Sequence, residues 1–296
     1  MKEIDVKAYA KLNLSLDVLG KLPDHYHELK MLMQTASLCD DVHISLRSGD
    51  IAVQTNFGFL PKDERNIAAQ AARAFFQAAG MPGQGADIVL YKRIPVGAGL
   101  GGGSADAAAV LRGLNVLTGA GFSAETLEKL GAGLGSDVPF CVRGGTKLAL
   151  GRGDELHPAA PMPMCGIVIC KPRFSIRTPD LYAKIDSRRS RIHPDTEGLL
   201  AALAAGDPEG IARRMYNVFE DVLPRSCGEI GTIKSELLDA GALGAVMSGT
   251  GSAVFGVFTD LEEARTAAER LRREDRECFP AVPVPENAEP LGGPAE

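Results

Sequence analysis

The residues best suited to chemistry lie in a glycine-rich stretch, Pro95-Val-Gly-Ala-Gly-Leu-Gly-Gly-Gly-Ser104, which has five glycines in seven positions. Glycine adopts positive φ angles without a Cβ clash and leaves its N–H uncovered, so such a loop directs several donors at one ligand. Ser104 is a favoured N-cap residue, and apolar residues recur after it at helical spacing up to Gly119. The free N–H groups and positive dipole end of that helix would face the loop, which predicts a phosphate site.

A flexible linker or a tight turn is the alternative for any glycine cluster. Strand-like residues 86–94 precede this loop and a capped helix follows it, which favours the phosphate site. A Walker loop is excluded, because Gly103 and Ser104 stand after Gly102 where that motif has Lys and then Ser or Thr. Residues 97–102 match the G-x-G-x-x-G sequence of the dinucleotide-binding fingerprint, but the structural context differs. A second helix is expected at 123–134, where that motif requires a parallel strand.

Three more polar residues are candidates for a role beside a bound phosphate. Residues 4–19 largely alternate apolar and polar types, which predicts a strand with Lys11 and Asn13 on one face. Asp137 lies at a break, where Pro139 disfavours helix at the residue before it. A solvated strand face and a helix cap are the ordinary explanations for a lone lysine and a lone aspartate. These residues therefore become informative only in combination.

The turn Pro23-Asp-His-Tyr-His27 carries two histidines and a tyrosine. Loops that rigid elements support often carry function, although a plain surface turn explains the same residues. Zinc binding is not expected there, because His25 and His27 have no third and fourth ligand nearby in the sequence.

The composition is that of an ordinary globular protein. The chain has 296 residues, 45% hydrophobic and 24% charged, with a net charge of −6, which disfavours a nucleic-acid surface. Its six cysteines form no C-x-x-C pair, and no signal segment leads the chain. The longest apolar run, 162–170, is too short for a membrane span. We therefore expect a cytoplasmic monomer or weak homodimer that binds neither nucleic acid nor a membrane.

Strand-like and helix-like segments predict an α+β fold of two domains. Helices are expected at residues 63–79, 104–118, 123–134, 178–185, 197–205, 208–223, 227–239 and 261–273, with Asp63 and Thr178 as caps. Three prolines within 158–163 mark the domain boundary. The chain then divides into an N-terminal domain, 1–157, a C-terminal domain, 164–284, and a Pro- and Gly-rich tail, 285–296, expected to be disordered.

Together these stretches resemble the GHMP kinases, a superfamily that includes galactokinase and the homoserine, mevalonate and phosphomevalonate kinases. Residues 95–109 are similar to its phosphate loop, P-x-x-x-G-L-G-S/G-S-A-A. Four more stretches match in order and spacing: Ala8-x-Ala-Lys-Leu-Asn13, Tyr26-His27, Gly135-x-Asp-Val-Pro139 and Ser248-Gly-Thr-Gly-Ser252. The resemblance implies two domains, each a mostly antiparallel sheet covered by helices, with the active site in the cleft between them.

The resemblance also implies an ATP-dependent kinase that uses Mg²⁺. Within the superfamily, the same stretches look like the branch that phosphorylates the 2-hydroxyl of a cytidine-diphosphate-linked methylerythritol in the non-mevalonate route to isoprenoids. By position, Asp137 would take the hydroxyl proton, and Lys11 would hold Asp137 and the reacting oxygen in place. The implied phosphate-binding set is Pro95, Gly97, Gly99, Leu100, Gly101, Gly102, Gly103 and Ser104, with the Ser104 hydroxyl near Mg²⁺.

The implied acceptor-binding set is Asn13, Tyr26, His27, Thr178 and Tyr182. Asn13 would bond the polyol, the two tyrosines would sandwich the cytosine, and His27 would read its polar edge. Two residues depart from the superfamily pattern: His25 stands where a glycine is usual, and Ala105 where many relatives have a second serine.

Arg152 and Asn66 are further candidates for contacts with substrate or nucleotide. Two other functions stay open. One is a different small-molecule kinase of the superfamily, such as a homoserine or mevalonate kinase. The other is a non-catalytic nucleotide sensor or RNA-binding relative, which the acidic charge and the presence of both Lys11 and Asp137 disfavour.

Overall fold

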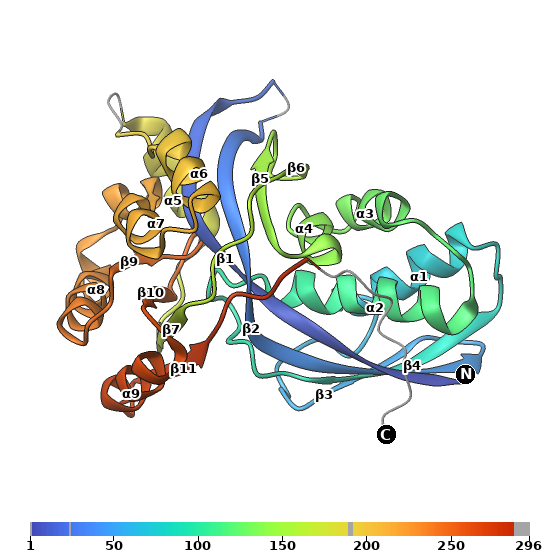
Figure 1. The fold of residues 1–296 in the computed structure, drawn as a ribbon. Coiled ribbons are helices and arrows are strands. Elements are labelled where there is room, and N and C mark those ends of the chain that lie inside the picture. The colour runs from blue at the N-terminus through green and yellow to red at the C-terminus, as the bar shows by residue number, and fades with distance from the viewer. Residues whose placement is uncertain (1, 24, 189–191, 287–296) are drawn as a thin grey trace.

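Two long N-terminal strands form the spine of the molecule (Figure 1). The computed structural model describes residues 2–23, 25–188 and 192–286. Strand β1 runs over Glu3–Lys21 and pairs antiparallel with β2, His27–Ser48. Register shifts, one of them between Tyr9 and Ala10, bend this hairpin. Strand β2 continues through this bulge as one element of 22 residues.

The first sheet has seven strands in the order β3-β4-β2-β1-β8, with β5 paired to β2 and β6 to β5. The added strands are β3 (Ala52–Thr55), β4 (Gln84–Tyr91), β5 (Thr146–Leu150), β6 (Glu155–Pro158) and β8 (Tyr216–Asn217). Its helices are α1 (Ile67–Ala78), α2 (Gly102–Thr118), α3 (Ala124–Ala132) and α4 (Val138–Arg143). They gather over one face of the sheet, so their apolar sides and the strands share one core (Figure 1).

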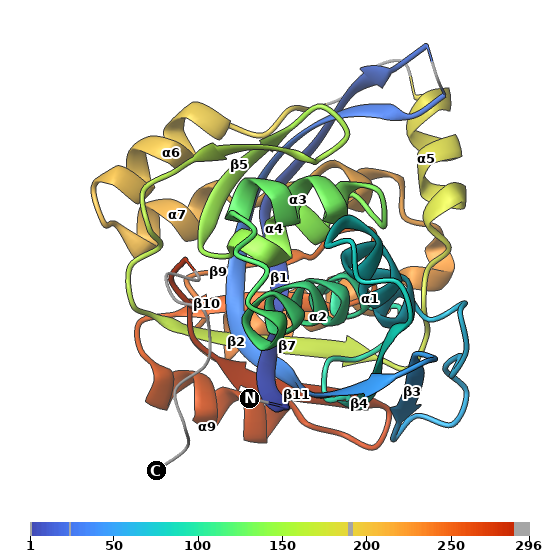
Figure 2. The same cartoon turned by 90° about the vertical axis from the view of Figure 1, so that its right-hand side faces the viewer.

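The second sheet is a four-stranded antiparallel layer in the order β11-β7-β10-β9. Its strands are β7 (Gly166–Pro172), β9 (Gly244–Met247), β10 (Val254–Phe258) and β11 (Arg276–Ala281). The helices of this half are α5 (Thr178–Ser187), α6 (Thr196–Ala204), α7 (Pro208–Arg214), α8 (Glu229–Asp239) and α9 (Leu261–Leu271), with 3-10 turns η1 (Val218–Val222) and η2 (Arg225–Cys227). Figure 2 shows α5 on one side of the long hairpin and α6 and α7 on the other. The expected α+β fold of two helix-covered sheets is confirmed.

Some predicted helix starts were wrong. Helix α1 begins at Ile67 rather than Asp63, because the Asn66 side chain accepts the Ala68 N–H at 2.9 Å and caps it. Helix α2 begins at Gly102 with Gly101 as its N-cap, which places Ser104 in the first turn. Pro139 lies inside the first turn of α4, where a proline is tolerated, so helix is not excluded at the residue before it.

The helix expected at 208–223 is also wrong beyond Arg214. There the chain forms β8, which pairs in parallel with Ser15 and Leu16 of β1. The Asn217 side chain donates to the carbonyl oxygens of Met247 and Gly249 at 2.8 and 2.7 Å. The sequence of this segment has a helical pattern, but its pairing with β1 determines the structure instead.

The C-terminal segment 282–286 returns to the first sheet. The Ser37 N–H donates to Val282 O, and the Val284 N–H donates to Thr35 O, both at 2.9 Å. Glu286 accepts from Lys147 Nζ at 2.8 Å. The tail expected to be disordered from 285 therefore starts within an ordered contact, and its residues 287–296 lie outside the described residues. Within the described part, no helix has the length and apolar character needed to cross a bilayer.

Deleting residues 282–296 is expected to lower the free energy of unfolding by about 1–3 kcal/mol, because backbone hydrogen bonds and an ion pair to the first sheet are lost. Urea denaturation measures the change. Deleting only 287–296 is the matched control, since it leaves every described contact intact. Equal stability of the two truncated chains would contradict a structural role for the segment.

Candidate active site

The glycine-rich loop takes the conformation that only glycine adopts easily. Gly97, Gly99 and Gly101 have φ angles of 65°, 77° and 69°. Three hydrogen bonds to carbonyl oxygens of the loop fix its backbone. Leu100 O accepts the Lys11 N–H, Ala98 O accepts the Ala253 N–H, and Gly99 O accepts the Ser248 hydroxyl, each at 3.0 Å. No described residue accepts a hydrogen bond from the N–H groups of 97–103. Those donors are available to a ligand.

A cavity of about 420 Å³ lies in front of this loop. Its lining combines the loop residues 95–104 with an apolar wall of Leu60, Pro61, Ile67, Leu90 and Ile94. One end therefore offers backbone donors beside a helix start, and the other offers apolar surface. An anionic tail joined to a flat hydrophobic group matches both ends.

Lys11 and Asp137 meet beside the loop. Lys11 Nζ is 3.5 Å from Asp137 Oδ2 and donates to Asn13 Oδ1 at 2.7 Å. Asp137 precedes α4, yet its side chain caps none of the N–H groups that the structure describes there. Its side chain is 28% exposed and that of Lys11 only 6%. Asp137 thus occupies the N-cap position of α4 without a capping bond from its side chain, and its carboxylate is accessible.

Two glycines make room for the Lys11 side chain. A Cβ on Gly101 would lie 2.8 Å from Lys11 Cγ, and one on Gly249 would lie 3.2 Å from Lys11 Nζ. Gly101 belongs to the loop and Gly249 to the turn 248–252 of the second half. The lysine is thus enclosed between the loop and that turn.

Ser104 lies on the side of the loop nearest to Asp137. A Cβ on Gly135 would be 3.9 Å from Ser104 Oγ, so this hydroxyl faces the turn that carries Asp137. In the described chain, no three His, Cys, Asp or Glu side chains are grouped as metal ligands. The Ser104 hydroxyl beside a phosphate loop nevertheless fits Mg²⁺, which takes few protein ligands and completes its shell with phosphate oxygens and water.

The candidate acceptor residues gather around α5. The His27 ring stacks on Tyr182 with centroids 4.4 Å apart, and its Nε2 is 2.7 Å from Asp186 Oδ1. Burial raises the pKa of Tyr182 to about 12, and the charge of Asp137 adds to the shift. Thr178 Oγ1 is 2.8 Å from Thr250 Oγ1.

Tyr26 is more exposed than His27 and Tyr182, at 59%. The Arg152 guanidinium lies 4.4 Å from the centroid of its ring. His25 has a φ of 69°, so a left-handed residue stands where the superfamily pattern has glycine. The turn keeps the glycine-like conformation despite the substitution. The sandwich of a base between Tyr26 and Tyr182 stays a prediction.

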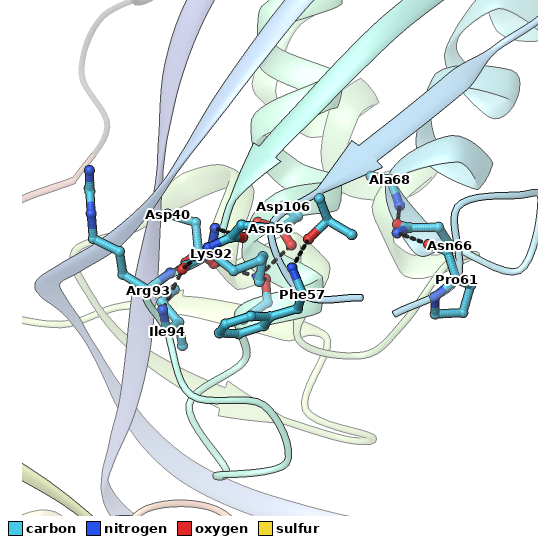
Figure 3. Close-up of polar contacts among 12 residues, drawn as sticks. Asp40, Asn56, Phe57, Pro61, Asn66, Ala68, Lys92, Arg93, Ile94 and Asp106 are labelled. Atoms are coloured by element: carbon cyan, nitrogen blue, oxygen red, sulfur yellow. Dashed lines mark hydrogen bonds and ion pairs between the residues drawn. The ribbon is translucent and has the colours of Figure 1, made fainter. Parts of the chain in front are cut away.

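Sequence reasoning missed a buried charged cluster in the cavity wall (Figure 3). Lys92 Nζ lies 2.5 Å from both Asp40 Oδ2 and Asp106 Oδ2. Burial raises the pKa of the Asp106 carboxyl to about 7, although the Lys92 charge opposes the shift. No sequence signal joins these residues, because Asp40 and Lys92 are 52 positions apart. Asn66, a candidate for a ligand contact, lines the same cavity and also caps α1.

Comparison with known proteins identifies the class of this site. Residues 66–145 match the GHMP kinases N terminal domain, and residues 199–277 match GHMP kinases C terminal. A crystal structure of homoserine kinase from Cytophaga hutchinsonii shares the fold, with a TM-score of 0.74 at 24% identity over 97% of this chain and 96% of that chain. The fold and its loop are those of a GHMP kinase, as the motifs indicate.

Closer relatives define the family within that class. A 4-diphosphocytidyl-2-C-methyl-D-erythritol kinase from Syntrophomonas wolfei is 42% identical over 94% of this chain and 97% of the relative. One from Pelotomaculum thermopropionicum is 44% identical over 93% and 96%. A crystal structure of 4-(cytidine 5'-diphospho)-2C-methyl-D-erythritol kinase gives a TM-score of 0.79 at 34% identity, covering 95% of this chain and 99% of that one. The chain belongs to the 4-diphosphocytidyl-2-C-methyl-D-erythritol kinase family.

Gly99→Ala is expected to weaken ATP binding at least about tenfold, because a residue strained by about 1–3 kcal/mol would displace the loop. The new Cβ would lie 2.1 Å from Ser248 O at a φ of 77°. Calorimetric titration with ATP measures the affinity. Gly231→Ala on α8 is the control, since no described atom lies within 4 Å of its Cβ position. Unchanged ATP affinity of Gly99→Ala would contradict the proposed role of the loop.

Proposed function

We propose that this chain transfers the γ-phosphoryl group of ATP to the 2-hydroxyl of 4-diphosphocytidyl-2-C-methyl-D-erythritol. The products are the 2-phosphate and ADP, in the non-mevalonate pathway to isoprenoid precursors. Membership of the kinase family supports the reaction. The observation that carries the mechanism is the Lys11–Asp137 pair, 3.5 Å apart beside a loop whose N–H groups are unpaired within the described chain.

The loop binds the nucleotide phosphates through its backbone. A charge-assisted hydrogen bond contributes roughly 1.5–3 kcal/mol, so a few N–H groups from 97–103 suffice to hold them. The N-terminus of α2 adds its dipole to this attraction. The apolar end of the cavity, with Leu60, Ile67 and Leu90, accepts the adenine.

Asp137 and Lys11 act on the acceptor. The 2-hydroxyl oxygen forms a bond to the γ-phosphorus, the bond from that phosphorus to the ADP oxygen breaks, and the hydroxyl proton passes to the Asp137 carboxylate. A carboxylate is a weak base for an alcohol, but a loose phosphoryl transition state depends mainly on positioning and charge neutralisation. Asp137 therefore chiefly orients the oxygen, and Lys11 stabilises the negative charge that develops there.

Mg²⁺ would lie near the Ser104 hydroxyl, with most of its ligands from phosphate and water. When bound, it would neutralise negative charge on the phosphate groups. Ser104 would hold it on the side of the loop that faces Asp137.

The acceptor is expected to bind against α5. Tyr26 and Tyr182 would sandwich the cytosine, and stacking contributes roughly 1–3 kcal/mol per base. Asp186 Oδ1 lies 2.7 Å from His27 Nε2 and fixes this imidazole, which would read the polar edge of the cytosine. Asn13 would bond the polyol, and Thr178 would line the same side. The net charge of −6 supports a small-molecule acceptor rather than nucleic acid, and we keep the proposal of a cytoplasmic monomer or weak homodimer.

A panel of acceptors with ATP and Mg²⁺ tests the function. We expect phosphate transfer to 4-diphosphocytidyl-2-C-methyl-D-erythritol, read as a new phosphomonoester signal by ³¹P NMR. Homoserine and mevalonate are the matched alternatives, because other superfamily members use them. Transfer to either one with none to the cytidyl compound would overturn the proposal.

Asp137→Ala is expected to lower kcat about 10²- to 10⁴-fold, the usual contribution of a positioned acid or base. ATP affinity should stay within about twofold, because Asp137 is not among the cavity-lining residues. Asp87→Ala on β4, an aspartate with a 43% exposed side chain, is the control. Unchanged kcat of Asp137→Ala would remove this residue from the mechanism.

A further inference from the structure

Figure 3 shows the buried cluster of Lys92, Asp40 and Asp106, of which Lys92 and Asp106 line the same cavity as the phosphate loop. Their side chains are 3%, 0% and 5% exposed. Lys92 Nζ contacts one oxygen of each carboxylate at 2.5 Å. The Lys92 ammonium group is already paired with both carboxylates. It is therefore not free to bind a phosphate group as the lysine of a Walker loop does.

The cluster holds both ends of the loop. At the start of the loop, Asp40 Oδ1 accepts the N–H groups of Arg93 and Ile94 at 2.5 and 2.8 Å. At its end, Lys92 Nζ lies 3.3 Å from Gly102 O, in addition to its contact with Asp106 of the same helix. One ammonium group therefore joins β2, the segment after β4 and the first turns of α2.

Stability alone does not account for the cluster. Burying charged groups is expensive, and hydrophobic residues of similar volume often replace a buried ion pair without loss of stability. Asp106 Oδ1 is buried, and no described residue forms a hydrogen bond with it. The cluster does fix the distance between the two ends of the phosphate loop, because short charge-assisted hydrogen bonds tolerate little displacement of the groups they join.

We propose that Lys92 is a positioning residue for nucleotide binding, which sets the distance between the two ends of the phosphate loop through Asp40 and Asp106. This inference rests on the proposed function, since the ligand of the loop is ATP. With the ends fixed, the N–H groups of 97–103 keep one arrangement before the phosphates arrive. Preorganised donors of this kind lose less entropy when the ligand binds.

The test compares Lys92→Met and the double variant Lys92→Met/Asp106→Leu with the wild-type protein. We expect the KM for ATP to rise about 10- to 100-fold in both, the usual effect of a small displacement of binding groups. The KM for the acceptor should stay within about twofold, because the acceptor residues lie on other elements. The double variant leaves the buried Asp40 carboxylate without its ammonium partner, so urea denaturation should show a loss of stability. Adding Asp40→Asn, whose Oδ1 can still accept the Arg93 and Ile94 N–H groups, should return the free energy of unfolding to the wild-type value while the KM for ATP stays high, which separates a positioning role from a folding role.

Arg93→Met is the matched control. Arg93 is the next residue along the chain and pairs with the next aspartate, Asp41, but its side chain is 55% exposed. Its KM for ATP should remain at the wild-type value. Asp40→Asn is a milder variant that keeps the shape of the side chain, and it should raise the KM for ATP severalfold while the protein stays folded.

Hydrogen exchange supplies a readout independent of turnover. In the double variant, the Lys11 and Ala253 amides, which donate to Leu100 O and Ala98 O of the loop, should exchange at least about tenfold faster than in the wild type, while amides of β7 remain unchanged. The proposal fails if the folded double variant or Asp40→Asn keeps the wild-type KM for ATP, or if the KM for ATP and acceptor rise together. A wild-type protein that binds ATP but phosphorylates no acceptor would refute the proposed function instead, and ATP affinity would still test Lys92.

Discussion

Three hydrogen bonds to the carbonyl oxygens of the glycine loop are the interaction on which the site depends. They come from the Lys11 N–H, the Ala253 N–H and the Ser248 hydroxyl. With its carbonyl groups held on the protein side, the loop presents its N–H groups to the cavity. One of these donors belongs to β1 and two belong to the second half of the chain, so both halves are required to form the phosphate site.

The same arrangement explains how the site works without a lysine in its loop. Lys11 enters from β1 and passes between Gly101 and Gly249, where any side chain would displace it. It reaches Asp137 at the point where the phosphates and the acceptor would meet. Asn217 of β8 holds the turn 248–252 through two carbonyl oxygens, so the parallel pairing of β8 with β1 also serves the site. Positive charge is thus supplied by a side chain of β1 rather than by a lysine within the loop.

Local patterns predicted much of this architecture. The loop, the strand that carries Lys11 and the α+β fold follow from glycine spacing, alternation and motif order, which depend on neighbours in the sequence. The Asp40–Lys92–Asp106 cluster could not be predicted, because the tertiary fold alone joins residues so far apart. The helix expected at 208–223 failed for a related reason: its second part has helical periodicity, but pairing with Ser15 and Leu16 prevails. The contact between Glu286 and Lys147 likewise depends on a distant strand.

The most direct measurement is a crystal structure of the ternary complex with 4-diphosphocytidyl-2-C-methyl-D-erythritol and a non-hydrolysable ATP analogue. Our account predicts the β- and γ-phosphates against the N–H groups of 97–103. It also predicts the acceptor 2-hydroxyl within hydrogen-bond distance of both Asp137 and Lys11, in line with the γ-phosphorus. Phosphates bound in another cavity, or a 2-hydroxyl remote from Asp137, would contradict it.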